Sequence, residues 1–282
     1  MDIDKDKTVP TIYVDLDGTL LGKNASLLHD HSGNRTNIGI DALAKAEKAG
    51  ADLVIATGRD RYRAEEFCRA AGIKNYIAEL GCVIHTTGED IVEYGDKAKA
   101  FMQENALSDS EFLGCVTQAA QALVDHFQGQ LEMHAPYNRD RFTSLLMRGN
   151  ISAEKANEIL SSNGWPFLEI IPNGHGMFRR TMPGVDNVLI YHLTPIGVTK
   201  AFGIAKDQEL RNIDPSTSYM IGDGMADALC YEVVNKVFVP SNGALSDTDV
   251  LDLSNKIENI IVLDDSHNKG FAKAIDFILH EN

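Results

Sequence analysis

The sequence predicts an α/β fold in which a Rossmann-like parallel sheet is flanked by helices and interrupted by an inserted α+β unit. Two observations predict it: apolar runs alternate with helical segments near both ends of the chain, and this alternation changes character in the middle. The length of 282 residues exceeds the ~100–200 residues usual for one domain, which favours two domains or an enlarged one.

The first part of the parallel sheet is predicted from two buried strands, each followed by a helix. Residues 11–15 form a short β-branched and aromatic run, and residues 51–57 form a second apolar run. Helical spacing follows each run, over residues 38–50 and 61–72, and a glycine ends both helices. An order of strand, helix, strand, helix implies a parallel sheet.

The same alternation resumes near the end of the chain. It predicts a helix from about residue 198, strands over 218–222 and 236–240, and helices over 225–234 and from 269 onward. These segments would complete the parallel sheet that residues 11–57 begin.

The middle of the chain predicts a different architecture. Two successive helices come first, and a third helix lies among four strands; the helices are 97–105, 108–127 and 153–163, and the strands are 130–134, 142–147, 167–171 and 187–193. We therefore expect residues 88–192 to form an inserted α+β cap, and residues 1–87 and 193–282 to form the core.

Charge and hydropathy exclude several classes of partner. The chain has 41 acidic against 26 basic side chains, a formal charge of −15, which disfavours nucleic acid and anionic lipid. No run of about 18 apolar residues is present, and the first ten residues do not resemble a signal peptide. Four scattered cysteines without a C-x-x-C pair are typical of reduced core thiols. We expect a cytoplasmic protein without membrane or nucleic acid partners; the sequence indicates no oligomeric state.

The segment DLDGT follows the first predicted strand, where α/β folds place ligand chemistry. Asp15 and Asp17 stand at i and i+2, and Gly18 permits a tight reversal, so two carboxylates are expected near one small volume. The alternative is an Asp-Gly turn that caps the next element.

The end of the second strand supplies groups suited to a phosphate, and a lysine further along stands out by its position. Thr57 and Gly58 end the second strand, where a hydroxyl and backbone N–H groups suit phosphate oxygens, although Thr57 also fits a helix cap. Lys200 lies at the start of a predicted helix, where a cation is unfavourable for the helix dipole. That position favours a functional reason for the lysine.

A second acidic segment, GDGMAD, ends the strand over 218–222 and opens a helix. Asp223 and Asp227 are one helical turn apart, so both can face the cleft that holds Asp15 and Asp17. Four clustered carboxylates repel one another unless a cation neutralises them. Ligands that are all oxygen atoms favour a hard divalent ion, and Mg²⁺, bound by a few carboxylates together with water and phosphate, fits best. Asp227 also fits a solvated residue in the first turn of a helix.

The predicted cap carries basic side chains near aromatic ones. Arg139, Arg141 and Arg179, with Arg180, are predicted to hold a sugar or a second anionic group of a substrate. The alternative is that they are solvated loop charges. The closest histidine pair, His29 and His31, has no zinc-ligand spacing around it, so we expect both to be surface residues.

Taken in order, these segments resemble the haloacid dehalogenase superfamily of aspartate-nucleophile phosphotransferases. DLDGT, the threonine of TGR, Lys200 and GDGMAD match its four motifs, over roughly the whole chain. The insertion lies where type II caps are found in this family, and ELGCVIH resembles a stretch of the Cof-type or sucrose-phosphatase-like group. One residue departs from the pattern: Ala226 stands where that group commonly has asparagine.

The resemblance implies a magnesium-dependent phosphate monoester hydrolase that acts on a small phosphorylated metabolite, such as a sugar phosphate, through an aspartyl-phosphate. Asp15 would be the nucleophile, Asp17 the general acid and base, and Thr57, Gly58 and Lys200 would bind the phosphoryl oxygens. Magnesium would be held by Asp15, by the backbone carbonyl of Asp17, by Asp223 and, through water, by Asp227. Alternatives are a phosphomutase and a non-catalytic module that binds a phosphorylated ligand; the absence of membrane spans excludes a P-type pump domain.

Overall fold

A computed structural model of the chain, with residues 9–175 and 181–281 described, contains two sheets, one of eight strands and one of four. The order of the larger sheet is β12-β11-β10-β1-β2-β3-β4-β5. Its strands are β1 Thr11–Val14, β2 Asp52–Ala56, β3 Asn75–Ala78, β4 Val83–Thr86, β5 Glu89–Val92, β10 Ser218–Ile221, β11 Lys236–Val239 and β12 Ile260–Val262.

The larger sheet is parallel from β12 to β3 and antiparallel at β4 and β5. The predicted α/β class with a parallel sheet is therefore confirmed. Strands β3, β4, β5 and β12, each of three or four residues, were not predicted.

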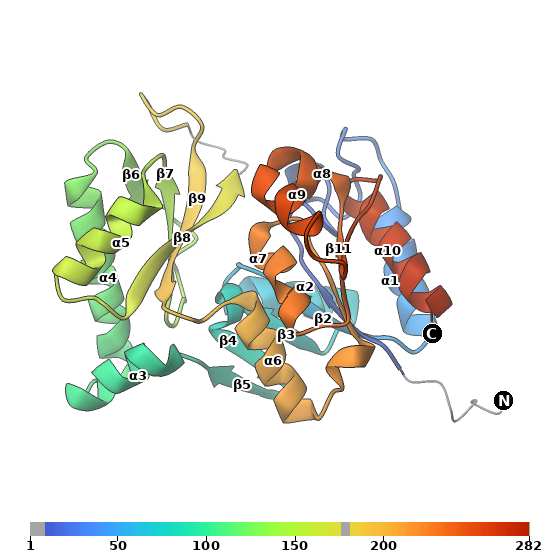
Figure 1. The fold of residues 1–282 in the computed structure, drawn as a ribbon, viewed down its shortest axis with the longest axis horizontal. Helices are drawn as coiled ribbons and strands as arrows, with labels where there is room; N and C mark the ends of the chain where they lie inside the picture. The colour runs from blue at the N-terminus through green and yellow to red at the C-terminus, as the bar shows by residue number, and fades with distance from the viewer. Residues whose placement is uncertain (1–8, 176–180, 282) are drawn as a thin grey trace.

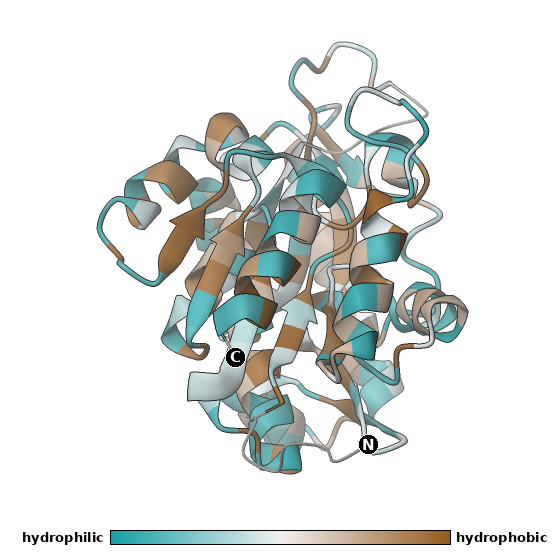
Figure 2. Ribbon diagram, turned by 90° about the vertical axis from the view of Figure 1, so that its right-hand side faces the viewer, coloured by the Kyte–Doolittle hydropathy of each residue, from teal (hydrophilic) through white to brown (hydrophobic). Residues whose placement is uncertain are grey.

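Helices cover both faces of the larger sheet (Figure 1). One face packs against α1 Ile38–Lys48, α2 Arg61–Ala71 and α10 His267–Glu281. The other packs against α6 Lys200–Arg211, α7 Met225–Ala228 and α9 Thr248–Ser254, while α8 Ser241–Ser246 follows β11. Figure 2 shows hydrophobic strands between helices whose outer surfaces are hydrophilic.

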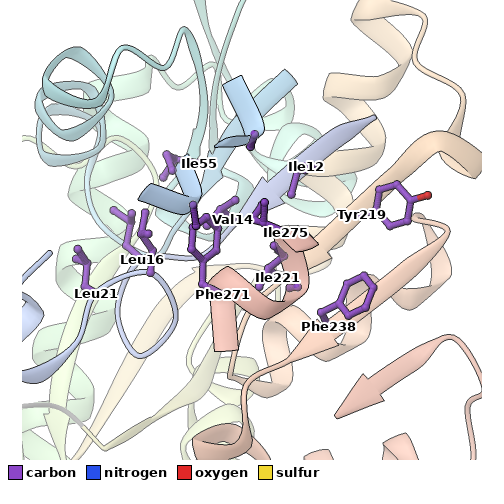
Figure 3. Packing of buried hydrophobic residues seen from close by; sticks show 14 of the residues in the cluster. Ile12, Val14, Leu16, Leu21, Ile55, Tyr219, Ile221, Phe238, Phe271 and Ile275 are labelled. Carbon is purple, nitrogen blue, oxygen red and sulfur yellow. The ribbon is translucent and has the colours of Figure 1, made fainter. Parts of the chain in front are cut away.

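Alternate residues of each buried strand point to opposite faces, as strand geometry requires. Ile12 and Val14 of β1 point toward Phe271 and Ile275 of α10 (Figure 3), whereas Tyr13 between them packs on the other face. Strands buried on both faces read as continuous apolar runs, which is why the sequence pattern identified β1.

The smaller unit is a four-stranded antiparallel sheet of order β6-β7-β9-β8 with helices on one face. Its strands are β6 Leu131–Met133, β7 Leu145–Gly149, β8 Leu168–His175 and β9 Leu189–Pro195, and its helices are α3 Gly95–Glu104, α4 Asp109–His126 and α5 Ala153–Ser162. In Figure 1, α4 and α5 lie on the side of this sheet that faces away from the larger sheet.

The chain passes from the larger sheet to the smaller unit after β5 and returns after β9. The two crossings touch: a Cβ built on Gly95, which has φ +71°, would lie 2.9 Å from the carbonyl oxygen of Ile196. These elements do not coincide with the predicted bounds of 88–192. Strand β5 lies within that range but pairs in the larger sheet, and β9 continues beyond it to Pro195. None of the helices in the described part of the chain has the length and hydropathy needed to cross a bilayer.

Candidate active site

Three neighbouring strands of the larger sheet deliver the predicted motifs to one edge. Strand β1 is hydrogen-bonded to β10 on one side and to β2 on the other. Asp15 follows β1, Asp223 follows β10 and Thr57 follows β2. Because parallel strands end at the same edge of a sheet, the three motifs lie side by side there.

Three carboxylates form a compact group at this edge. Among the described residues, Asp15, Asp223 and Asp227 each offer an oxygen within 4.8 Å of the others. Asp15 and Asp227 are buried. Asp17, the fourth carboxylate of the predicted cluster, is not part of this group, and its carboxylate instead accepts hydrogen bonds from Arg59.

Lys200 supplies the positive charge of this group. Its buried ammonium donates to Oδ1 of Asp15 and to Oδ1 of Asp227, both at 2.6 Å. The helix that carries it begins at Lys200, with Thr199 as N-cap. This helix packs against Gly81, where a Cβ would lie 2.2 Å from the carbonyl oxygen of Thr199. Close backbone packing therefore holds Lys200 over the carboxylates.

The electrostatics of the group favour the binding of a cation. Burial raises the pKa of Asp15 well above its ordinary range, and the carboxylates of Asp227 and Asp223 add to the rise, against Lys200. Burial, with Asp227 as the second cause, raises the pKa of Asp223 to about 7. Burial opposes the ammonium of Lys200, but Asp15 and Asp227 raise its pKa. One ammonium among three carboxylates leaves negative charge uncompensated, and oxygen ligands of this kind fit Mg²⁺.

Two glycines allow the carboxylates to come this close. Gly18 has φ +89°, and a Cβ there would lie 2.3 Å from Oδ2 of Asp223. A Cβ on Gly222 would lie 2.2 Å from Cγ of Asp227. Any larger residue at either position would displace a carboxylate of the group.

Asp17 is held by Arg59, the arginine of the TGR segment. Nε of Arg59 donates to Oδ2 of Asp17 at 2.7 Å, and Nη2 donates to Oδ1 at 2.6 Å. Burial alone would lower the pKa of Arg59, but the hydrogen bonds and charge of Asp17 raise it. Sequence reasoning assigned no role to Arg59, although its position directly after the predicted phosphate-binding residues was a usable signal.

Thr57 and Gly58 form a turn directly beside the carboxylates. Thr57 is buried, and its Oγ1 accepts a hydrogen bond from the Arg59 N–H at 3.3 Å. Its hydroxyl hydrogen and the N–H of Gly58 have no acceptor among residues 9–175 and 181–281. Both donors are therefore open to a phosphate oxygen, as predicted for this turn.

The predicted cap arginines differ in burial. Arg141 is buried and hydrogen-bonded to the protein itself, so its predicted contact with a substrate is not supported by the geometry. Arg139 is exposed on the same loop. Arg179 lies outside the described residues.

The predicted strand over 142–147 begins later, at Leu145, because the N–H of Phe142 donates to the Glu79 carboxylate instead.

Asn242 is a site residue that sequence reasoning missed. Its Nδ2 donates to Oδ2 of Asp223 and to the carbonyl oxygen of Gly18, both at 2.9 Å, and its Oδ1 accepts from the His267 N–H at 2.8 Å. It follows β11, at the same sheet edge as the other motifs, and that position was a usable signal. Asn242 brings an amide to Asp223 in a chain that has Ala226 in its last motif.

Comparison with known proteins extends over nearly the whole chain. A family model described as haloacid dehalogenase-like hydrolase matches residues 12–109. A phosphoglycolate phosphatase of Methanococcoides burtonii is 21% identical over 269 residues, covering 95% of this chain and 96% of its own. One of Halobacterium salinarum is 25% identical over 278 residues, covering 97% and 99%. The solved sucrose-phosphatase of Synechocystis, in complex with sucrose and phosphate, has a TM-score of 0.64 at 16% identity, covering 95% and 97%.

Proposed function

Since the chain belongs to the haloacid dehalogenase superfamily and is a phosphatase of its Cof type, we propose that it hydrolyses phosphate monoesters through an aspartyl-phosphate, with magnesium. One observation carries the proposal: buried Asp15 and Asp227 share the ammonium of Lys200, with Asp223 in the same group. A nucleophilic carboxylate, a phosphate-neutralising cation and metal ligands thereby meet in one small volume.

Each residue of the site has its own role in this proposed reaction. Asp15 attacks phosphorus, and Lys200 with the open donors of Thr57 and Gly58 holds the equatorial oxygens. Asp17 protonates the leaving alkoxide and afterwards takes the proton of the attacking water. Arg59 orients Asp17 for both transfers, because it binds both carboxylate oxygens.

Asp15, Asp223 and the backbone carbonyl of Asp17 would hold the magnesium ion, and Asp227 would bind it through water. When bound, the ion supplies the positive charge that three carboxylates and an incoming phosphate require. The raised pKa values of Asp15 and Asp223 support this assignment, because burial without a cation disfavours their ionised forms.

We propose a small phosphorylated metabolite as substrate, a sugar phosphate or a related compound. Two matched relatives bear the name phosphoglycolate phosphatase, and a structural neighbour is a sucrose-phosphatase, so phosphoglycolate and sucrose phosphate are the first candidates. We further propose that residues 88–192, the smaller unit with its linkers, form a cap that closes over the site and selects the leaving group. The four free cysteines fit a reducing compartment, and we propose the cytoplasm.

The test is phosphate release by the purified full chain with magnesium, against a panel of sugar phosphates, phosphoglycolate, phosphoglycerates, nucleotides and cofactor phosphates. We expect release from at least one class, and none from Asp15→Asn. A phosphomutase would instead transfer the group to a second sugar and require a bisphosphate activator. A protein that binds phosphorylated ligands without releasing phosphate would be the non-catalytic module.

A further inference from the structure

All three carbonyl groups of the Thr57–Gly58–Arg59 turn are held by hydrogen bonds from outside the turn. The Leu80 N–H donates to the Thr57 oxygen at 3.2 Å, and the Glu79 N–H donates to the Arg59 oxygen at 2.9 Å. The middle carbonyl, of Gly58, accepts from Nη2 of Arg141 at 2.8 Å. Residues from two parts of the chain thus fix the orientation of the turn.

The Arg141 contact acts on the peptide that links Gly58 to Arg59. In a planar trans peptide the carbonyl and the N–H point in opposite directions, so holding the Gly58 oxygen also aims the Arg59 N–H. That N–H donates to Oγ1 of Thr57, which leaves the hydroxyl hydrogen of Thr57 to donate elsewhere. The chain of contacts therefore runs from Arg141 to the hydroxyl proposed to bind the phosphate.

Arg141 belongs to the smaller unit, between β6 and β7, yet its side chain is fully buried against the core. Nε donates to the Tyr137 oxygen at 3.0 Å, and Nη1 donates to Oγ of Ser144 at 2.9 Å. Nη1 also lies 3.8 Å from Oε2 of Glu79. The guanidinium thus contacts both units, the larger one at Gly58 and Glu79 and the smaller one at Tyr137 and Ser144. Its side chain is not exposed to solvent.

Glu79 completes the connection from the core side. Its carboxylate accepts from the Phe142 N–H at 3.1 Å and from Oγ of Ser144 at 2.7 Å, both in the smaller unit. Glu79 and Leu80 have φ of +51° and +59°, the left-handed region that non-glycine residues rarely adopt. Such strain persists where the surroundings require it, and here it aims two N–H groups at the turn.

A buried ion pair of this kind contributes little net stability, because desolvation offsets the attraction. The pair instead fixes the positions of the groups that it binds, among them the Gly58 carbonyl. A second residue of the smaller unit lies close to the same turn: a Cβ built on Gly58 would lie 2.8 Å from Cε1 of His192. The turn is therefore enclosed by the smaller unit at both its carbonyl and its Cα.

We propose that Arg141 is a positioning residue that orients the phosphate-binding turn. The Gly58 carbonyl, and with it the Arg59 N–H, is held in place only while the smaller unit packs against the larger sheet. This inference rests on the proposed function. It also changes the expectation for Arg141 drawn from the sequence. Because the turn binds the phosphate, which every substrate shares, loss of Arg141 affects small and large esters alike.

The test compares Arg141→Lys with the wild type in the full chain with magnesium. A lysine keeps the positive charge near Glu79, but one ammonium cannot reach the three acceptors of the guanidinium. We expect kcat/KM to fall by about 10- to 100-fold for a sugar phosphate and by the same factor for a small aryl phosphate, since a hydrogen bond to a charged donor is lost. Affinity for inorganic phosphate, measured as a competitive inhibitor, should fall in parallel, and hydrogen exchange of peptides containing the turn should accelerate.

Arg211→Lys is the matched control, because Arg211 is a largely buried arginine in ion pairs with Asp207 and Asp52, at the opposite end of β2 from Thr57. It should leave the phosphate affinity at the wild-type value. Where Arg141→Lys does not fold, Glu79→Gln with Arg141→Met removes both buried charges and still lacks the contact to Gly58, so the same loss is expected.

Unchanged phosphate affinity in a folded Arg141 variant would overturn the proposal, as would a loss confined to the sugar phosphate. Both outcomes are read in an enzyme whose wild type releases phosphate. A wild type that releases none from any substrate would instead overturn the proposed function.

Discussion

Both carboxylate oxygens of Asp17 accept hydrogen bonds from the guanidinium of Arg59, at 2.7 and 2.6 Å. Replacement of Arg59 by alanine should leave Asp17 without this orientation. General acid catalysis contributes about 10²–10⁴-fold, so we expect kcat to fall within that range on alkyl phosphates. The fall should be smaller on an aryl phosphate, because a good leaving group needs less protonation.

Arg69→Ala is the matched control for Arg59, because Arg69 makes the same two-point contact with Glu66 on the exposed surface of α2. An exposed pair of this kind stabilises little, so kcat on both esters should stay at the wild-type value. An equal loss on alkyl and aryl esters in Arg59→Ala would contradict the orienting role.

Asp15→Asn should abolish turnover, by more than about a thousandfold, because the amide has the same shape but does not attack phosphorus. The folded protein should nevertheless gain stability in chelator, since a buried charge that burial and two carboxylates disfavour is removed. Phosphate release and thermal melts of both proteins measure the two effects. A phosphoryl adduct mapped by mass spectrometry to another residue would refute the assignment.

The metal-free protein should lose stability as the pH rises. The pKa of Asp223 is raised to about 7 in the folded chain, above its value of about 3.9 when unfolded. The folded state therefore holds an additional proton between these values, and the free energy of unfolding falls as the pH rises from about 4 to about 7. Melts in chelator at pH 5.5 and pH 8 should show the lower midpoint at pH 8. Asp223→Asn should reduce the difference; an undiminished difference would trace the effect to other groups.

Calcium should compete with magnesium and fail to support turnover. Because magnesium prefers near-octahedral geometry with short bonds, Asp15 would bind it through one carboxylate oxygen and keep the other free to attack phosphorus. Calcium accepts more ligands and can take both oxygens of Asp15. Titration of calcium into the magnesium enzyme, with phosphate release as readout, tests this; full activity with calcium, or in excess chelator, would exclude the metal-assisted mechanism.

Asn242→Ala should weaken magnesium binding by about 10- to 100-fold, the range found for residues that orient metal ligands. The Asn242 amide fixes Oδ2 of Asp223 and the Gly18 carbonyl, and its loss frees both. Calorimetric titration with magnesium measures the affinity directly. Asn259→Ala is the control, because this amide bonds backbone oxygens of Tyr231 and Asn235 instead; equal losses in the two variants would mean a general loss of stability.

The motifs and the central strands were predictable because each is written in a short stretch of sequence. Buried parallel strands are continuous apolar runs, and their carboxyl ends place Asp15, Thr57 and Asp223 together without further information. Lys200 was singled out by an unfavourable helix position together with its match to the third family motif, and it contacts two of the three clustered carboxylates.

The side-chain directions were not predictable in the same way. Asp17 and Asp15 are two residues apart, yet one binds Arg59 and the other Lys200, because partners distant in sequence decide where each carboxylate points. Arg141 resembled a substrate-binding residue, but its acceptor at Gly58 is 83 positions away. Composition and local spacing carry no record of such contacts.

The touching crossings at Gly95 and Ile196 make the smaller unit an insertion whose two ends meet. Exchange of everything between them for a different unit should leave the strands that carry Asp15, Thr57 and Asp223 with the same neighbours in the larger sheet. Under the proposal that the smaller unit selects the leaving group, substrate specificity and phosphoryl chemistry are encoded in separate stretches of the chain. The buried Arg141 limits that freedom, because a transplanted unit must also bring a donor for the Gly58 carbonyl.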